Sequence, residues 1–355
     1  MSHDTAISQR TIGLDVGDRF TQVCVLDGTG EIMEEGRVRS TREGFEARFR
    51  ELARSRVVLE VGAQSAWMSR ALESWGHEVL VANSYQMGRI YRGQDKSDRR
   101  DAETLARIGR SDPALLRPIR HRGAQVMADR SLVRSREILV RCRTSLVNHV
   151  RGAVKTVGAR LPSSGTAQFA RRARGGLPEA LREALEPILD TIQELTDRIR
   201  AYERQMERVA AERYPQTALF EPIHGVGPVT RLAYVLSLDD PYRFATSRDV
   251  GAYLGLRPKR RQSGDEDPEL PITRAGDPQL RRLLVQCAHY ILGPFGRDSD
   301  LRRFGLRLAA RGGRAAKKRA VVAVARKLAV LLHRLWVTGE DYDPLYLARR
   351  RQEVA

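Results

Sequence analysis

The feature that most limits how this chain can fold is a regular run of apolar residues between positions 181 and 209. The residues recur at alternating steps of four and three, which is the a/d seam of a coiled coil. The run predicts a helix from Pro178, kinked or restarted at Pro187, that packs along a partner helix. We expect a second copy of the chain to supply the partner; the alternative is a hairpin with the preceding helical segment of the same chain. The seam comprises Leu181, Leu185, Ile188, Ile192, Leu195, Ile199, Tyr202, Met206 and Val209.

The charge balance favours a polyanionic partner, which could be nucleic acid or an acidic membrane surface. The 355 residues are enough for two or three domains, and 62 Lys and Arg against 44 Asp and Glu give a net charge of +18. Nearly all of this excess is arginine, which clamps phosphate with two donors at once. A GC-rich genome would also enrich arginine, so we give the arginine enrichment only half weight as an indication of a phosphate-bearing partner.

Other properties exclude several classes of protein. No run approaches the roughly 20 apolar residues of a membrane span, and the first ten residues lack the apolar core of a signal peptide. Cys24, Cys142 and Cys287 lie far apart and fit neither a disulfide framework nor a zinc site. We therefore expect a cytoplasmic protein with no membrane partner.

The first hundred residues alternate strand and helix. β-rich runs are predicted at 11–16, 21–26, 31–38, 56–61 and 77–82, with helices at 41–52 and 65–75. Three strands in a meander followed by helix, strand, helix and strand is the ribonuclease-H-like order. We expect an α/β domain over 8–120, oligomerisation helices with a basic loop near 158–176 over 121–215, a mainly α-helical domain over 216–340 and a tail over 341–355.

Four carboxylates form the first candidate site. Asp15 ends the first strand, Glu60 ends the buried fourth strand, and Asp98 and Asp101 are three apart on the next helix, on one face. Carboxylates that converge from two strands and a helix would hold two divalent ions about 3.5–4 Å apart, as phosphoryl transfer requires. The alternatives are that Asp15 caps a turn and that the helical pair binds neighbouring arginines on a solvated surface. The order and the topology together favour the metal site.

Two features of the last third could bind and cut a phosphate backbone. Gly225-Val226-Gly227-Pro228 precedes a helix, where backbone N–H groups bind phosphate, although a plain turn between helices is about as consistent with it. Ser263 follows a basic run, which is part of the setting a serine nucleophile needs; from composition alone it is a loop serine. The residues expected to bind nucleic acid are Gly225, Gly227, Lys259, Arg260, Arg261, Arg274 and Arg281.

These motifs resemble those of the DEDD transposases of bacterial insertion sequences, also called the bridge recombinases. The resemblance covers about 10–345. It rests on the DVG at Asp15, the LEVG at Glu60 and the KSDRRDA of 96–102. It also rests on GVGPVT at 225–230, LGLRP at 254–258, Gln262-Ser263-Gly264, TRAGD at 273–277 and LRRL at 280–283.

The resemblance implies a function and a set of partners. It implies a RuvC-like domain with a tetrad matching Asp15, Glu60, Asp98 and Asp101, which binds Mg²⁺ or Mn²⁺, and a transposase domain whose nucleophile matches Ser263. In this family the serine attacks DNA and forms a covalent phosphoserine link, and the acidic site of another subunit completes the active centre. A structured noncoding bridge RNA pairs with donor and target DNA. Homodimers assemble into tetramers, and the enzyme joins the nucleoid when active.

One stretch departs from the family pattern. The family is usually basic after the Ser-Gly motif, whereas residues 265–269 read Asp-Glu-Asp-Pro-Glu, which would repel phosphate.

Two alternative functions remain open. A RuvC-like nuclease would cut branched DNA through water with the carboxylates alone, and a basic architectural protein would bridge nucleic acids without catalysis.

Overall fold

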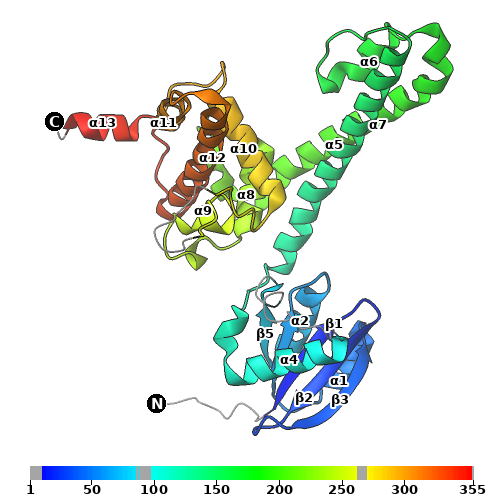
Figure 1. The fold of residues 1–355 in the computed structure, drawn as a ribbon, viewed down its shortest axis with the longest axis vertical. Coiled ribbons are helices and arrows are strands. Elements are labelled where there is room, and N and C mark those ends of the chain that lie inside the picture. The colour runs from blue at the N-terminus through cyan, green and yellow to red at the C-terminus, as the bar shows by residue number, and fades with distance from the viewer. Residues whose placement is uncertain (1–9, 85–86, 88–96, 262–269, 354–355) are drawn as a thin grey trace. The chain divides into compact units, whose positions relative to one another are not determined.

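The computed structural model describes residues 10–84, 87, 97–261 and 270–353, without the side chains of 351–353. The chain divides into two compact units, 1–121 and 122–355, and each is described by itself (Figure 1). The first unit is a mixed α/β domain and the second is helical. Both findings agree with the fold expected from the sequence.

The first unit contains one five-stranded sheet. Strands β1 and β4 are central, in the order β3-β2-β1-β4-β5. β1 pairs antiparallel with β2 and parallel with β4, and β4 pairs parallel with β5. All five predicted strands are confirmed to within two residues at each end. The strands are β1 (Thr11–Val16), β2 (Phe20–Leu26), β3 (Ile32–Arg39), β4 (Arg56–Glu60) and β5 (Glu78–Ala82).

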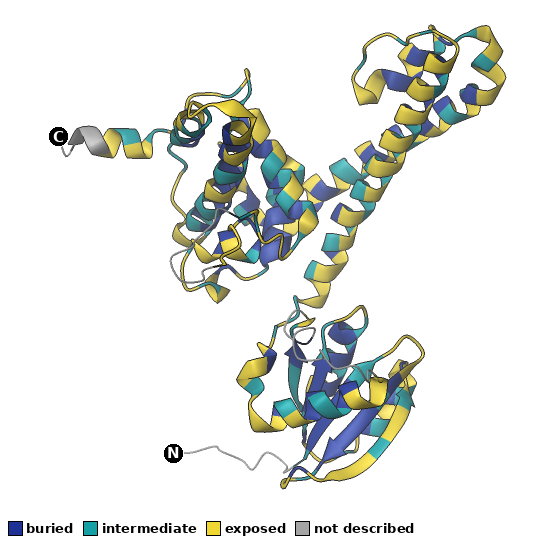
Figure 2. Ribbon diagram, in the orientation of Figure 1, coloured by how far each residue is buried: buried dark blue, intermediate teal, exposed yellow. Residues whose placement is uncertain are grey.

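The two faces of the sheet are covered by different helices. Ile12 and Leu14 of β1 pack in one apolar cluster with Phe45 of α1 (Arg42–Phe49) and Met68 of α2 (Ser65–Ser74). The opposite face is covered by α4 (Asp98–Ser111), which lies across the sheet in Figure 1. The edge strand β3 is mostly exposed, whereas β1 and β4 are mostly buried (Figure 2).

Helix α4 approaches β1 backbone to backbone. A Cβ atom added to Gly13 would lie 1.9 Å from the carbonyl oxygen of Ala102 and 2.6 Å from the nitrogen of Ala106. Only glycine fits at this contact, because any side chain would have to push the helix away from the sheet. Gly13 therefore fixes how close α4 comes to the strands.

Two long antiparallel helices begin the second unit. They are α5 (Ala124–Thr156) and α7 (Glu179–Arg213), which pack along each other in the same chain. The partner of the predicted seam is thus α5, which was the alternative prediction; the second copy of the chain remains a proposal. The buried stripe also differs from the strict seam, because Leu189 and Thr196 are buried while Leu195 is only half-buried.

The segment between these helices is not simply the expected basic loop. It contains a 3₁₀ turn at Thr166–Gln168 and the short helix α6 (Phe169–Arg174). Phe169 and Ala173 of α6 are buried against Val150 of α5 and Leu189 of α7. The apolar residues on one side of α6 give this basic stretch a small hydrophobic core, which could not be predicted from the pattern of charged residues.

The rest of the second unit is a helical bundle. Its core contains the fully buried Tyr234 and Leu328, and Tyr234 donates a hydrogen bond to the carbonyl oxygen of Ala329 at 2.6 Å. None of the helices that the structure describes has the length and apolar character that a membrane span requires. The bundle helices are α8 (Pro228–Leu238), α9 (Asp249–Tyr253), α10 (Pro278–Leu292), α11 (Asp300–Ala309), α12 (Gly313–Thr338) and α13 (Tyr346–Glu353), with 3₁₀ turns at Pro215–Phe220 and Pro241–Arg243. A further 3₁₀ turn, Pro113–Leu116, belongs to the first unit.

The contact between α4 and the sheet predicts a large effect of Gly13→Ala. We expect the substitution to destabilise the first unit by about 3 kcal/mol or more, because the added methyl group meets backbone atoms that cannot move aside. The matched control is Gly36→Ala on edge strand β3, where an added Cβ meets no atom within 4 Å.

Cys24 reports on this region, because it is fully buried beside Gly13 and burial raises the pKa of its thiol to about 11. Pulsed thiol labelling in urea, read at the Cys24 peptide by mass spectrometry, should show earlier labelling in Gly13→Ala than in the wild type or Gly36→Ala. Equal labelling midpoints in the two variants would contradict the prediction.

Candidate active site

The strand ends place Asp15 and Glu60 beside each other. Leu14 and Leu59 are the last paired residues of the parallel strands β1 and β4, and the two acids follow them directly. Alternate residues of a strand face the same side. Asp15 therefore shares the face of Gly13, which meets α4, and Glu60 shares the face of Val58, whose side chain lies against Gly109 of α4. Both acids are half-buried on the side of the sheet that α4 covers.

The first turn of α4 carries the other two acids. Ser97 caps the helix, and its hydroxyl accepts a hydrogen bond from the backbone N–H of Arg100 at 3.3 Å. Asp101 points to the buried side and is 7 % exposed, whereas Asp98 is exposed. Acidic residues in the first turn are stabilised by the partial positive charge of a helix N-terminus. The two acids that the spacing predicts on one face therefore differ in burial.

The direction of α4 brings this turn toward the strand ends. Arg56 at the start of β4 donates a hydrogen bond to the carbonyl oxygen of Gly109, near the end of the helix, at 3.1 Å. Ala102, near its start, lies against Gly13. The helix thus runs opposite to β1 and β4, and its first turn lies at the end of the sheet that carries Asp15 and Glu60.

The carboxylates are the oxygen ligands that Mg²⁺ and Mn²⁺ prefer. However, within 10–84, 87, 97–261 and 270–353 no three acidic, histidine or cysteine side chains lie close enough together to hold a metal ion. The structure brings Asp15, Glu60 and Asp101 to one layer but not into a preformed three-ligand site. The predicted metal-binding role stays a prediction.

The glycine motif at 225–228 forms a tight turn before α8. Gly225 has φ +95°, and a Cβ there would lie 3.0 Å from the ring of Tyr290. Gly227 is the N-cap of α8 and Pro228 its first residue. The turn therefore has a packing role at Gly225, and the open space around Gly227 leaves the helix N-terminus accessible.

Two further glycine turns pack against each other. Gly255 of the LGLRP motif has φ +66°, and a Cβ there would lie 2.3 Å from the nitrogen of Ala275. Gly276 of the TRAGD motif has φ +69°, and a Cβ there would lie 2.1 Å from the carbonyl oxygen of Tyr253. Both positions need glycine for the backbone conformation and for the close approach. The two motifs are thus halves of one structural junction.

Arg281 clamps this junction. One guanidinium nitrogen, Nη1, donates hydrogen bonds to the carbonyl oxygens of Leu254 at 2.9 Å and Ala275 at 2.6 Å. Burial lowers the pKa of the guanidinium below its usual value, without making it neutral. Arg281 is predicted to bind nucleic acid, but these contacts give it a positioning role inside the protein.

A buried network secures the start of α10. Asp277 accepts hydrogen bonds from the backbone N–H groups of Gln279 and Leu280, and also from Arg130 of α5 at 2.5 Å and the hydroxyl of Ser237 at 3.1 Å. Although burial opposes it, the charge of Arg130 and these hydrogen bonds hold the pKa of Asp277 below its usual value. The sequence motif TRAGD gave no sign of this partnership, because Arg130 is remote in the chain.

The other cations that were predicted to bind nucleic acid lie on or beside two chain segments that pair through backbone hydrogen bonds. The backbone N–H of Lys259 donates to the carbonyl oxygen of Pro271 at 2.9 Å, and that of Thr273 to Arg257 at 2.9 Å. Lys259, Arg260, Arg261 and Arg274 are exposed, and Arg274 has a left-handed backbone at φ 59°. Ser263, Gly264 and the acidic stretch 265–269 lie outside the described residues, as does Lys96.

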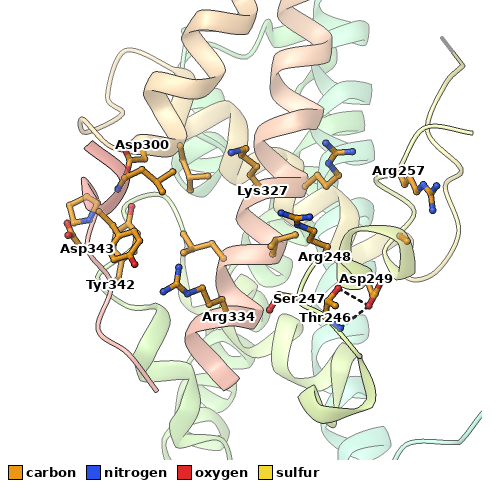
Figure 3. Close-up of a pocket in the computed structure, with 18 residues that line it drawn as sticks. Thr246, Ser247, Arg248, Asp249, Arg257, Asp300, Lys327, Arg334, Tyr342 and Asp343 are labelled. Carbon is orange, nitrogen blue, oxygen red and sulfur yellow. Dashed lines mark hydrogen bonds between the residues drawn. The ribbon is translucent and has the colours of Figure 1, made fainter. Parts of the chain in front are cut away.

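The second unit contains a cavity of about 930 Å³ that no sequence motif predicted. It lies along α12, between the segment around α9 and the chain that leads into α13, and carries Arg248, Lys327 and Arg334 in its walls (Figure 3). Its residues come from three distant stretches of sequence with no motif in common, so only the fold brings them together.

Comparison with known proteins identifies the family. A model of the DEDD transposases of IS110 matches residues 12–158, and a model described as "Transposase IS116/IS110/IS902 family" matches residues 217–300. The chain is 30 % identical to a protein of Pseudomonas aeruginosa named probable family 20 transposase, over 82 % of this chain and 86 % of that protein. The chain belongs to the IS110 family of transposases.

Further relatives extend the match to nearly the whole chain. The transposase is 26 % identical to that of insertion sequence element IS1111A from Coxiella burnetii, over 94 % of this chain and 91 % of that protein. It is 22 % identical to a pilin gene-inverting protein of Moraxella lacunata, over 95 % and 98 %. Membership of this family implies an enzyme that cleaves and rejoins DNA, and the DEDD type implies use of a divalent metal.

The role of Arg281 can be tested against its neighbour. Arg281→Ala should lower the free energy of unfolding by about 1.5–3 kcal/mol, because it removes charged hydrogen bonds to two carbonyl oxygens. Arg282→Ala removes an exposed ion pair with Glu137 and should cost about 1 kcal/mol or less. Urea unfolding of both variants measures the difference.

A phosphate contact would give a different result for Arg281→Ala. DNA binding would then weaken and its salt dependence would become shallower, with unchanged unfolding. That outcome would restore the nucleic-acid-binding role predicted from the sequence.

Proposed function

We propose that this transposase cuts and exchanges donor and target DNA strands through a covalent link to Ser263, assisted by Asp15, Glu60, Asp98 and Asp101, with a structured noncoding RNA that selects the DNA sites. The observation that carries the proposal is the layer formed by the sheet and α4. It places two strand-end carboxylates and a buried helical carboxylate on the same side of one sheet. The strand order β3-β2-β1-β4-β5 supports the RuvC-like assignment of this unit.

Ser263 would act as the nucleophile. Its oxygen would attack the scissile phosphorus, and a bond would form between them. The serine O–H bond and the bond from phosphorus to a deoxyribose oxygen would break, and that oxygen would leave with the proton that the serine gives up. The reverse reaction with the hydroxyl of another strand rejoins DNA without nucleotide hydrolysis. The basic residues Lys259, Arg260 and Arg261, just before the serine in the sequence, support charge stabilisation at this point.

The carboxylates supply the second half of the proposed centre. Asp15, Glu60, Asp98 and Asp101 would hold divalent ions, which when bound would neutralise phosphate charge and favour the deprotonated nucleophile. Asp101 would position the others because it is buried on the side of α4 that faces the sheet. Asp98 is exposed at the helix start, where its side chain is accessible to a ligand.

Partners and assembly follow from the family and the charge. A net charge of +18 favours binding of both DNA and a guide RNA. The α5–α7 hairpin would serve as the coiled-coil element through which dimers pair into tetramers, and the acidic site of one subunit would act with the serine of another. We place this activity in the cytoplasm, at the nucleoid.

The alternative is a RuvC-like nuclease that cuts branched DNA through water. A relative named for gene inversion favours the recombinase, because inversion requires that cut strands be rejoined. The nuclease would need the carboxylates but not Ser263, so the serine distinguishes the two functions.

Ser263→Ala should abolish the covalent protein–DNA product while DNA binding stays within about twofold of the wild type, because alanine lacks the attacking oxygen. Denaturing gels with labelled DNA detect the covalent product. The control is Ser131→Ala on α5, an exposed serine whose hydroxyl donates to the carbonyl oxygen of Met127 in the same helix. Cleavage without a covalent product in Ser263→Ala would support the nuclease, and full recombination would exclude this serine.

Metal binding can be measured without activity. Mn²⁺ at about 100 times its dissociation constant should stabilise the wild type by about 2.7 kcal/mol, and Asp101→Asn should lose this stabilisation. Asp112→Asn, at the other end of α4, is the control, because its carboxylate caps a 3₁₀ turn. Thermal unfolding with and without Mn²⁺ gives the shift. An equal shift in Asp101→Asn, or none in the wild type, would contradict the metal site.

A further inference from the structure

The cavity along α12 is lined by more basic than acidic side chains. Its cationic wall comprises Arg248, Arg257, Arg326, Lys327 and Arg334. Figure 3 shows Lys327 and Arg334 extending from α12, and Arg248 extending from the segment before α9. Five cations around one concave space focus a positive potential, because low-dielectric walls reduce solvent screening.

Most of these cations lack a partner in the described part of the chain. The guanidinium groups of Arg248, Arg257 and Arg326 make no hydrogen bond or ion pair with any described residue. The ammonium group of Lys327 lies 4.3 Å from the centroid of the Phe304 ring. Only Arg334 has a described carboxylate partner, Glu340, at 2.9 Å.

The acidic residues of the same wall are already used by the protein. Asp249 accepts hydrogen bonds from the backbone N–H and the hydroxyl of Thr246, both at 2.9 Å. Asp300 accepts from the backbone N–H of Leu347 at 2.7 Å, and Asp343 from that of Leu345 at 2.9 Å. These acids fasten the chain that forms the wall and keep their negative charge, so the five cations of the lining outnumber its three carboxylates by two.

The cavity also offers apolar and aromatic surface. Leu301, Val330 and Leu331 line it, and Tyr342 and Tyr346 stand on the side formed by the chain after α12. Arg334 lies 5.1 Å from the ring centroid of Tyr346, and its hydrogen bond lowers the pKa of that phenol. An exposed aromatic ring beside a cation is the arrangement that binds a base next to its phosphate.

The position of Arg326 depends on a glycine. A Cβ added to Gly251 of α9 would lie 2.9 Å from Cγ of Arg326 and 3.4 Å from its Cδ. The aliphatic stem of Arg326 therefore packs on Gly251, and its guanidinium is exposed at the cavity wall. This close packing shows that part of the wall is shaped by the core beneath it.

We infer that this cavity holds an unpaired nucleotide of a single-stranded nucleic acid, with phosphates on Arg248, Arg326 and Lys327 and the base against Tyr342 or Tyr346. Its size of about 930 Å³ lies within the range of about 300–1,000 Å³ that small ligands occupy. A single nucleotide fits such a cavity, whereas a duplex would present its bases paired and stacked. The inference rests on the proposed function, because strand exchange and RNA guidance both expose unpaired nucleotides.

The test compares two pairs of cations on one helix. Arg326→Gln/Lys327→Gln removes two charges from the cavity, and Lys317→Gln/Lys318→Gln removes two exposed charges from the same helix outside it. Full-length proteins freed of nucleic acid are titrated with a labelled short pyrimidine DNA strand, its RNA counterpart and the matching DNA duplex. Fluorescence anisotropy is read at several salt concentrations.

The cavity pair should weaken binding of a single strand by about tenfold and lower the magnitude of its log–log salt slope by about 1.4, which corresponds to two phosphate contacts at about 0.7 each. The control pair and duplex binding should change much less. A larger effect on DNA or on RNA would identify which strand occupies the cavity, and either supports the inference. Equal losses for both pairs, or a loss confined to the duplex, would overturn it.

A second measurement does not depend on a variant that folds. Irradiation of the wild type with an iodouracil-substituted strand should link the base to Tyr342 or Tyr346, as read by peptide mass spectrometry. Competition with thymidine monophosphate separates a strand from a free nucleotide. If the monophosphate binds the cavity while the strand binds elsewhere and links to neither tyrosine, the inference is wrong.

Failure here is distinguishable from failure of the proposed function. The titrations need no strand cleavage, so Ser263→Ala should bind single strands through the cavity as the wild type does. If Ser263→Ala loses the covalent product and Arg326→Gln/Lys327→Gln has no effect on binding, the serine mechanism is supported and the nucleotide site in the cavity is contradicted. The opposite result would support the nucleotide site and contradict Ser263 as the nucleophile.

Discussion

The contact between Gly13 and α4 sets the geometry of the first unit. Because the strand carries no side chain there, the helix backbone lies against the sheet, with a would-be Cβ only 1.9 Å from the oxygen of Ala102. The position of the first turn of α4, and hence of Asp101, depends on this closeness. A larger residue would lift the helix and move Asp101 away from Asp15 and Glu60. The candidate active site is therefore determined by a residue that has no chemistry of its own.

Much of this unit could be predicted from the sequence, because its signals are local. The alternation of apolar residues located the five strands, and Ser97 before Asp98 marked the start of a helix. What could not be predicted is the difference in burial between Asp98 and Asp101. Both lie in the first turn three residues apart, and only the packing of α4 on the sheet decides which one is covered.

The second unit was less predictable, because its organising contacts join distant residues. The seam of α7 predicted a partner helix but could not show that α5 of the same chain provides it. The motifs LGLRP and TRAGD supported only the family resemblance, and Arg281 was expected to bind nucleic acid, yet Gly255, Gly276 and Arg281 build a junction that holds two loops together. The role of these residues in folding and any role in binding overlap in sequence, and only the contacts separate them.

The first turns of α5 are held from two directions. Asp129 accepts hydrogen bonds from Tyr214 at 2.8 Å and Arg213 at 2.6 Å, where α7 ends, and Arg130 pairs with Asp277 at the start of α10. The long hairpin is therefore attached to the helical bundle through its base, while its far tip extends away from these contacts. A change in the tilt of the hairpin would therefore displace Arg130, and with it Asp277 and the neighbouring glycine turn at Gly276. Binding of another molecule at the tip would thus act, through the base of the hairpin, on the described segments before and after the proposed nucleophile.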